Sequence, residues 1–322
     1  MSLNSESFQL SKLLNETRNE LVRIIQDSED FPKPYLTNFA KSNGKMIRPT
    51  LFYIFRTIGK NEITKEDYSV AVSIELLHMA TLVHDDIIDD SPLRRGSPSI
   101  QAEFGKDVAV YSGDYLFTLF FKLVVAETQN LSLIELNVDT MHAILKGELN
   151  QKALRYNLKM DLISYFRSIY GKTAAIFGMA CYEGAMLARL SVQKCNLAKR
   201  IGYHIGIVFQ IYDDILDYSS TQKELKKPVK EDLKEGIYTL PLILAFRKNP
   251  SLFEPILRKK ENLSKQDIEY ITNLIDKLDG IQDSKMLVKH YIQKIKNELA
   301  QFDDYKIKYM ITQILNAIEE RR

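Results

Sequence analysis

The sequence contains few cysteines, glycines and prolines, and neither sign of charge dominates. Only Cys181 and Cys195 occur among its 322 residues, so no disulfide framework is implied and a reducing cytoplasm is the expected location. Thirteen glycines and nine prolines leave few turn signals for a β-rich fold. Lysine plus arginine exceed aspartate plus glutamate by 44 − 42 = 2. No global field therefore favours nucleic acid, and any strong electrostatics must be local.

The sequence also lacks a leader-peptide pattern and a long uninterrupted apolar run. It starts with MSLNSESFQL, which is polar and places Glu6 where a signal peptide would need basic and then apolar residues. The most apolar stretch, YLFTLFFKLVVA at residues 115–126, is interrupted by Lys122 and is too short to span a bilayer. We expect this stretch to be a buried core helix, and we expect no signal peptide and no membrane span.

Apolar residues make up 45% of the chain and recur at the three- and four-residue spacing of amphipathic helices. Residues 66–89 show this pattern, and the Ser-Pro pair at 91–92 would end that helix because proline disfavours helical geometry in the residue before it. No segment alternates convincingly with period two. Further helices are expected at 8–28, 33–41, 48–58, 108–127, 131–153, 160–190, 192–218, 239–247, 264–278, 283–300 and 303–320. The sequence thus predicts one all-α domain.

Two aspartate clusters stand out against this helical background. The first consists of Asp85, Asp86 and Asp89, and the second of Asp213, Asp214 and Asp217, with Gln210 three residues before it. On a helix, the first and last aspartates of each cluster lie one turn apart on the same face. Crowded carboxylates repel one another, and oxygen ligands without cysteine suit Mg²⁺, which is typically shared with a phosphorylated substrate. The alternative for either cluster alone is an exposed acidic helix face, but large apolar residues flank both.

Basic residues close to the clusters would complete a diphosphate site. The guanidinium groups of Arg94 and Arg95, directly after the first cluster, suit phosphate oxygens. The other candidates are Lys45 and Arg48 in GKMIRP, Lys172 with Thr173 in YGKTAA, and Lys227 and Lys230 after the second cluster. Each of these residues alone would be ordinary surface charge, but together they indicate a diphosphate-binding site.

Three other motifs favour different chemistry, and we set them aside. The GKT at residues 171–173 is not a P-loop, since Phe166 stands where the first glycine is required. The HDD beginning at His84 suggests a metal phosphohydrolase, which needs further histidines and leaves the second cluster unexplained. The ELLH at residues 75–78 has the Glu-x-x-His spacing of di-iron bundles, which need two copies. The remaining histidines, His142, His204 and His290, are expected to be structural.

In combination, these motifs resemble the trans-isoprenyl diphosphate synthase (polyprenyl synthetase) family. Matching segments run from GKMIRP through LLHMATLVHDDIIDDSPLRRGSPS, YSGDYL, GKTA and FQIYDDILDY to KPVKEDLKEGIYTLPL, over residues 40–245. The nearest resemblance is to the catalytic subunit of bacterial heptaprenyl or hexaprenyl diphosphate synthases. It implies an all-α, single-domain helical bundle around a central cavity (the isoprenoid synthase fold) over residues 1–322. It also implies a homodimer, with a small regulatory subunit as an optional partner.

The resemblance further implies a reaction and a role for each motif residue. Asp85, Asp86 and Asp89 would bind Mg²⁺ and the allylic diphosphate, and Asp213, Asp214 and Asp217 would hold the rest of three Mg²⁺. Arg94, Lys172 and Lys227 would contact the allylic diphosphate, Lys45, Arg48, His78 and Arg95 would hold isopentenyl diphosphate, and Thr173 and Gln210 would face the carbocation. The allylic diphosphate would ionise, isopentenyl diphosphate would attack the cation, and a proton would be lost to the departing diphosphate. No protein nucleophile is required.

Two departures from the family pattern affect substrate affinity. KKPVKED stands where many relatives have GKPVGND, so Lys230 replaces a glycine and is a weaker candidate than Lys227. Ile237 stands where many relatives carry a lysine that contacts diphosphate, and it should not be given that role.

The residues before the first cluster bear on product length. Ala80 and Thr81, five and four residues before Asp85, occupy positions where family members with short products often place an aromatic ring. Leu77 lies about one helical turn before them and continues the same helix face. Phe117, Phe120 and Phe121 of a neighbouring helix are candidates for the floor of a deeper pocket. A deeper pocket accommodates a longer chain, and the resemblance implies about six to eight isoprene units, as in quinone side chains.

Several alternatives remain open. Ala80 is also explained as a small residue at a helix crossing. The other functions to be tested are a shorter-chain farnesyl or geranylgeranyl diphosphate synthase, a terpene cyclase, and a non-catalytic subunit of a heteromeric synthase.

Overall fold

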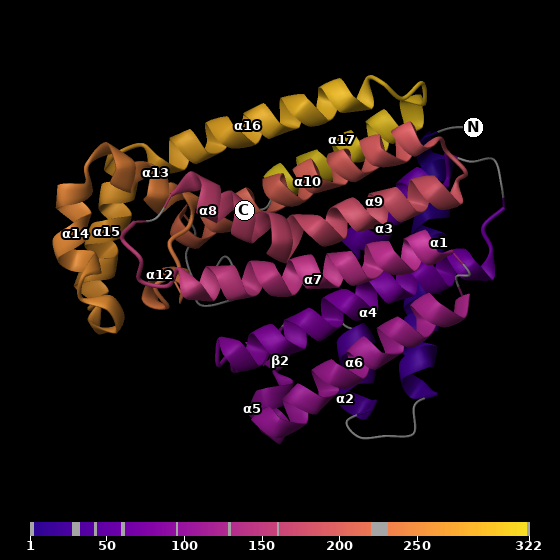
Figure 1. Cartoon of the computed structure of the whole chain (residues 1–322), viewed down its shortest axis with the longest axis horizontal. Coiled ribbons are helices and arrows are strands. Elements are labelled where there is room, and N and C mark those ends of the chain that lie inside the picture. Colours follow the sequence, from indigo (N-terminus) through magenta and orange to yellow (C-terminus); the bar gives the residue numbers. More distant parts are fainter. Residues whose placement is uncertain are drawn as a thin grey trace. The chain divides into compact units, whose positions relative to one another are not determined.

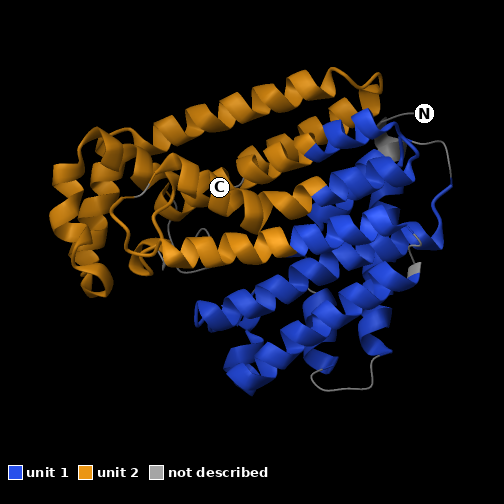
Figure 2. Ribbon diagram, in the orientation of Figure 1, with its two compact units in different colours: residues 1–141, 179–199 blue, residues 142–178, 200–322 orange. Residues whose placement is uncertain are grey.

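The structure is a computed structural model, and it describes residues 3–27, 33–41, 44–58, 62–94, 96–127, 130–159, 161–219 and 231–320. These residues are almost entirely helical, and the one short hairpin contains the only strands among them (Figure 1). The all-α fold class is therefore confirmed. The chain divides into two compact units: unit 1 comprises Met1–Met141 and Met179–Lys199, and unit 2 comprises His142–Gly178 and Arg200–Arg322 (Figure 2). The single domain over residues 1–322 stays a prediction.

Unit 1 is built mainly from the N-terminal helices. They are α1 (Leu3–Gln26), α2 (Lys33–Lys41), α3 (Ile47–Arg56), α4 (Lys65–Ile88), α5 (Ile100–Phe104) and α6 (Lys106–Glu127). Between α4 and α5 lies a hairpin of β1 (Leu93–Arg94) and β2 (Ser97–Pro98). Three helices pass from one unit into the other: α7 (Leu131–Ala153), α9 (Ala175–Leu187) and α10 (Val192–Ser219).

Helix α4 is the central buried helix of unit 1. Its start is fixed by a capping interaction in which the backbone N–H of Thr64 donates to Oδ2 of Asp67 at 2.7 Å. Along its length Leu77 and Ala80 have no solvent exposure. Helix α6 packs along it, and a Cβ added to Gly113 of α6 would lie 2.4 Å from Nε2 of His84. The missing side chain at this position lets the two helices approach closely.

Helix α6 begins two residues before the predicted helix over 108–127 and ends where it does, but it is less buried than the core helix expected from the apolar stretch at 115–126. Leu116 and Phe120 are fully buried, but Val125 is 61% exposed, so only one side of the helix faces the core. By length and composition, Lys106–Ala126 is the one described helix that could cross a membrane, and 44% of its most apolar window is buried. The apolar stretch at 115–126 alone is too short to span a bilayer, but the whole helix is long enough. One such helix is weak evidence for a membrane span, because core helices share these properties.

Unit 2 contains the rest of the chain. Its own elements are α8 (Leu162–Ile169), a π-helix η1 (Tyr170–Ala174), α12 (Glu231–Lys234), α13 (Leu240–Lys248), α14 (Pro250–Leu257), a 3₁₀ turn η2 (Lys260–Asn262), α15 (Lys265–Lys277), α16 (Gly280–Leu299) and α17 (Tyr305–Glu319). The helix predicted over 160–190 is helical from Leu162 to Leu187, but the π-helical turn η1 lies within it between α8 and α9. A π-helical turn of this kind frequently marks a functional site.

Candidate functional site

The first aspartate cluster lies at the C-terminal end of α4, in unit 1. The backbone N–H of Asp89 donates to the carbonyl of Asp85 at 2.9 Å, so helical geometry continues to Asp89. Asp85 and Asp89 therefore share one face of the helix, as the spacing predicted. The next residue, Asp90, adopts a left-handed backbone conformation with φ 48° and ends the helix. The cluster thus stands at the point where the chain leaves α4 for the hairpin.

Arg94 of the hairpin pairs directly with Asp86. Its Nε donates to Oδ1 and Oδ2 of Asp86 at 2.9 and 3.1 Å, and its Nη2 also donates to Oδ1. Asp86 is only 4% exposed, and burial raises the pKa of its carboxyl while Arg94 opposes that rise. The structure therefore brings together the acidic and basic halves of the LVHDDIIDDSPLRR segment.

Unit 1 also contains other residues predicted from the sequence. Lys45 is exposed before α3, Arg48 lies in the first turn of α3, and His78 is half-buried on α4. Thr81 is half-buried as well, and its hydroxyl donates to the carbonyl of His78 at 2.8 Å. Arg95, Lys227 and Lys230 lie outside the described residues.

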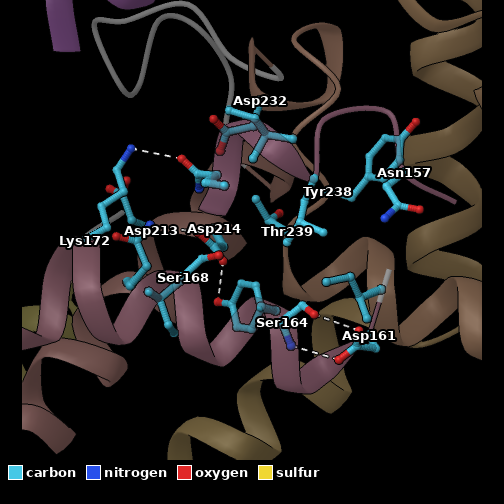
Figure 3. Close-up of a pocket in the computed structure, with 17 residues that line it drawn as sticks. Asn157, Asp161, Ser164, Ser168, Lys172, Asp213, Asp214, Asp232, Tyr238 and Thr239 are labelled. Atoms are coloured by element: carbon cyan, nitrogen blue, oxygen red, sulfur yellow. Dashed lines mark hydrogen bonds between the residues drawn. The ribbon is translucent and has the colours of Figure 1, made fainter. Parts of the chain in front are cut away.

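Unit 2 contains a cavity of about 190 Å³, formed by parts of α7, α8, η1, α10, α12, α13 and the connecting segments after α7 and α12 (Figure 3). Of the residues predicted from the sequence, it is lined by Lys172, Gln210, Asp213 and Asp214. Ile237, which was not expected to contact diphosphate, also lines this cavity. Asp217 is 7% exposed and does not line the cavity, although it belongs to the same cluster.

Lys172 is positioned by a close approach between α7 and η1. A Cβ on Gly147 would lie 2.4 Å from the backbone nitrogen of Lys172, and a Cβ on Gly171 would lie 2.4 Å from the carbonyl oxygen of Ala143. Only glycine fits at both places. The close approach leaves Nζ of Lys172 3.1 Å from Oε2 of Glu148, with which it forms a salt bridge. Nζ also donates to Oε1 of Gln151 at 3.1 Å (Figure 3).

A hydrogen-bond network surrounds Asp214 in the same unit. The hydroxyl of Tyr165 donates to its Oδ2 at 2.5 Å, and Nε2 of Gln210 donates to its Oδ1 at 2.9 Å. The hydroxyl of Thr173 in turn donates to Oε1 of Gln210 at 2.7 Å. Burial raises the pKa of Asp214 to about 7, although these hydrogen bonds oppose the rise. The network thus connects two residues expected to face the carbocation with one expected to bind metal.

Sequence reasoning missed Asp232 on the cavity wall (Figure 3). This residue belongs to the KED of a lysine-rich segment that was interpreted for its basic residues alone. Burial raises its pKa to about 8, and repulsion from Asp217 and Asp214 adds to the rise. The sequence signal that could have identified Asp232 is a further carboxylate shortly after the second cluster. Tyr165 was missed as well, since nothing in its local sequence distinguishes it from a core tyrosine.

The carboxylates within each unit fit a hard cation that also binds a diphosphate. They offer oxygen ligands only, and burial raises the pKa values of Asp214 and Asp232, so that a bound cation would stabilise their charged forms. Among the described residues, no three acidic, histidine or cysteine side chains converge as a closed metal site. Mg²⁺ does not need such a site, because it keeps several waters and takes other ligands from substrate phosphates.

Comparisons with known proteins identify a family and similar proteins. The family model described as Polyprenyl synthetase matches residues 31–275. Heptaprenyl diphosphate synthase component 2 of Bacillus subtilis (strain 168) is 31% identical over 325 residues, covering 99% of this chain and 92% of that protein. The crystal structure of geranylgeranyl pyrophosphate synthase from Lactobacillus brevis ATCC 367 has a TM-score of 0.89 and 36% identity, covering 96% of both chains. A polyprenyl synthase from Caulobacter crescentus CB15, complexed with calcium and isoprenyl diphosphate, has a TM-score of 0.89 and 27% identity, covering 100% of this chain and 98% of that one.

Proposed function

Because the chain belongs to the polyprenyl synthetase family of trans-prenyl diphosphate synthases, we propose that it condenses an allylic diphosphate with isopentenyl diphosphate. The expected product is a medium-to-long all-trans polyprenyl diphosphate. The observation that carries the proposal is the pairing of acidic and basic groups in both units. Arg94 forms a salt bridge with Asp86 in unit 1, and Lys172 lines the same cavity as Asp213 and Asp214 in unit 2.

The proposed cofactor is Mg²⁺, held by Asp85, Asp86 and Asp89 in unit 1 and by Asp213, Asp214 and Asp217 in unit 2. When bound, Mg²⁺ supplies positive charge that stabilises the diphosphate as it leaves. The oxygen-only donor set supports this choice, and so does the complex of the Caulobacter crescentus relative with calcium and isoprenyl diphosphate.

The chain's own basic groups would bind and orient the two substrates. Arg94 and Lys172 each pair with a carboxylate here, and they would take phosphate oxygens of the allylic substrate as further partners. Isopentenyl diphosphate would be held by Lys45, Arg48 and His78. Arg95 and Lys227, which lie outside the described residues, complete the two substrate sites in this proposal.

Polar groups of unit 2 would stabilise the carbocation. Thr173 donates to Gln210, so the carbonyl dipole of that amide is fixed before the substrate ionises. Preorganised dipoles of this kind act where charge develops and need no reorganisation during the reaction. The chain need not supply a base, since the departing diphosphate can take the proton. An apolar surrounding would keep water away from the cation.

The proposed product has about six to eight isoprene units, since a small residue at the pocket wall leaves room for a long chain. Ala80 and Leu77 are fully buried on α4, and Thr81 is half-buried beside them. The Bacillus subtilis relative is named a heptaprenyl synthase component, which supports this length. The Lactobacillus brevis structure is of a geranylgeranyl synthase, so a shorter product is the alternative.

The proposed assembly is a homodimer in the cytoplasm, with both units acting as a single domain. The Bacillus subtilis relative is named component 2 of its enzyme, which supports testing a small partner subunit. Both cysteines are buried and free, which fits a reducing compartment.

Incubation of the purified chain with radiolabelled isopentenyl diphosphate, farnesyl diphosphate and Mg²⁺ tests the proposal. We expect labelled, butanol-extractable product whose chromatogram gives the chain length. No labelled product, even after candidate partner subunits are added, would overturn the prenyltransferase assignment. A cyclised hydrocarbon formed from farnesyl diphosphate alone would identify a terpene cyclase instead.

A further inference from the structure

A second, much smaller cavity lies inside unit 1, and no residue of either aspartate cluster lines it. Its water-accessible volume is about 10 Å³, which is at the lower limit of the space that one water molecule occupies. Four helices form its wall, α4, α6, α7 and α9. The wall combines apolar side chains such as Val124 and Leu133 with polar side chains of Ser69, Ser73, Asn137 and Glu183.

Asn137 and Glu183 form a buried polar pair on this wall. Glu183 is 1% exposed and Asn137 is 2% exposed. Nδ2 of Asn137 donates to Oε1 of Glu183 at 2.5 Å and to the carbonyl of Leu133 at 2.9 Å. Oε2 of Glu183 and Oδ1 of Asn137 have no hydrogen-bond partner among the described residues. Burial raises the pKa of Glu183 to about 8, so at neutral pH it is largely a neutral acid with a proton to donate.

A buried polar atom without a partner is costly, and native proteins usually satisfy such atoms with protein groups or ordered water. One acceptor and one donor next to a water-sized space are what a bound water needs. The pair would therefore hold a water molecule that faces Ser69 and Ser73 across the cavity.

The cavity lies farther along α4 than the position associated with chain length. Ala80, Ser73 and Ser69 come five, twelve and sixteen residues before Asp85. At the helical rise, they lie about 7, 18 and 24 Å along the axis from Asp85. At 3.6 residues per turn, the three fall within about 40° of one another, so they form one stripe of small side chains, flanked by Leu76 and Leu77 between Ala80 and Ser73. This stripe leads from the level of Ala80 to Asn137 and Glu183.

We propose that Asn137 and Glu183, with a water bound between them, form a polar floor that limits the length of the prenyl chain. This inference rests on the proposed function, because it presumes a chain growing from Asp85 along α4. The advancing end of that chain is hydrocarbon, which gains free energy against apolar walls. At the floor it would displace the water and leave buried polar atoms unpaired, which opposes further growth.

Two substitutions that keep side-chain volume and remove polarity test the floor. Glu183→Met and Asn137→Leu make this wall apolar, and we expect both to shift the product distribution to chains at least one isoprene unit longer. Ser73→Leu adds bulk from the opposite wall, and we expect it to shorten the products. All three are assayed as full-length protein with labelled isopentenyl diphosphate, and folding is checked by circular dichroism and thermal melting.

Matched controls separate the floor from a merely structural role. Glu183→Gln keeps a polar side chain of the same shape and should leave product length unchanged. Thr140→Val changes a buried polar residue one turn along α7, outside the cavity lining, and should also leave it unchanged. A structural pair would lower the melting temperature of the variants and leave the product ladder as it is.

Each outcome decides for or against the floor. Unchanged product length in Asn137→Leu and Ser73→Leu would overturn it even if Glu183→Met does not fold, while prenyltransferase activity would stand. Wild-type protein that forms no prenyl product under any condition would instead overturn the proposed function. Longer products with either apolar substitution, together with shorter products from Ser73→Leu, would support the floor.

Discussion

The hydroxyl of Tyr165 donates a 2.5 Å hydrogen bond to Oδ2 of Asp214, and both side chains are buried in unit 2. The other carboxylate oxygen of Asp214 accepts from Gln210, so both of its oxygens are oriented by neighbours. A residue that the sequence did not single out therefore fixes the direction of a carboxylate expected to bind Mg²⁺. Loss of a partner of this kind typically costs about 10- to 100-fold in metal affinity or activity.

Replacing the hydroxyl of Tyr165 should weaken metal binding. In Tyr165→Phe, Oδ2 of Asp214 loses its donor, and we expect metal affinity or turnover to fall about tenfold. Steady-state rates measured against Mg²⁺ concentration check this. Tyr170→Phe is the control, because Tyr170 is 43% exposed and its ring packs against Tyr203 outside the network. An unchanged Mg²⁺ dependence with only a lower melting temperature would show that the bond is structural.

Adding bulk at position 80 should shorten the product without stopping the reaction. Ala80 is fully buried on α4, so Ala80→Phe would fill space on the small-residue stripe. Overpacking costs about 1–3 kcal/mol of stability, which a melting curve would reveal. Chromatography of the labelled products gives the chain length. Lys65→Phe places the same ring at an exposed position of the same helix and should change nothing. If the Ala80→Phe ladder equals that of the wild type, Ala80 does not line the path of the chain.

The stability of unit 1 should fall as pH rises, because Glu183 loses its proton. Burial raises the pKa of its carboxyl from 4.5 to about 8, so the folded state binds its proton more tightly than the unfolded state. The resulting stability is complete below pH 4.5 and is lost as pH rises through 8. The other polar residues of the cavity, two serines and Asn137, do not titrate.

Glu183→Gln removes this titration, so the variant should gain stability relative to wild type between pH 5 and pH 9. The gain should be on the order of a few kcal/mol. Melting temperatures of both proteins across that range provide the measurement. Parallel curves for the two proteins would show that Glu183 does not titrate with a raised pKa.

The sequence predicted most helices well, because amphipathic periodicity is a local signal. The bounds 33–41 and 131–153 agree with α2 and α7, and α4 differs from its prediction by one residue at each end. The π-helix at Tyr170–Ala174, inside the predicted helix over 160–190, was not predictable because it accompanies a contact with a distant helix. Gly147 and Gly171 make that contact, and no window around 170 contains the first of them.

In the candidate site too, contacts between residues close in sequence were predictable, and contacts between distant residues were not. Arg94 lies eight residues from Asp86, and their pairing was predictable from the sign reversal in one short loop. Tyr165 lies 49 residues from Asp214, so their hydrogen bond depends on how α8 and α10 pack. Asp232 is near the second cluster in sequence, but its burial and raised pKa depend on the cavity that forms around it.

The measurement that tests the central claim compares the two aspartate clusters in one assay. If both clusters serve the same Mg²⁺-dependent condensation, Asp85→Ala and Asp213→Ala should each lower labelled isopentenyl diphosphate incorporation by at least about a hundredfold while both proteins stay folded. Asp90→Ala is the control, since its exposed carboxylate pairs with Lys106 at 2.8 Å, also interacts with Gln101, and lies outside the cluster. Near-normal incorporation by either cluster variant would contradict the account.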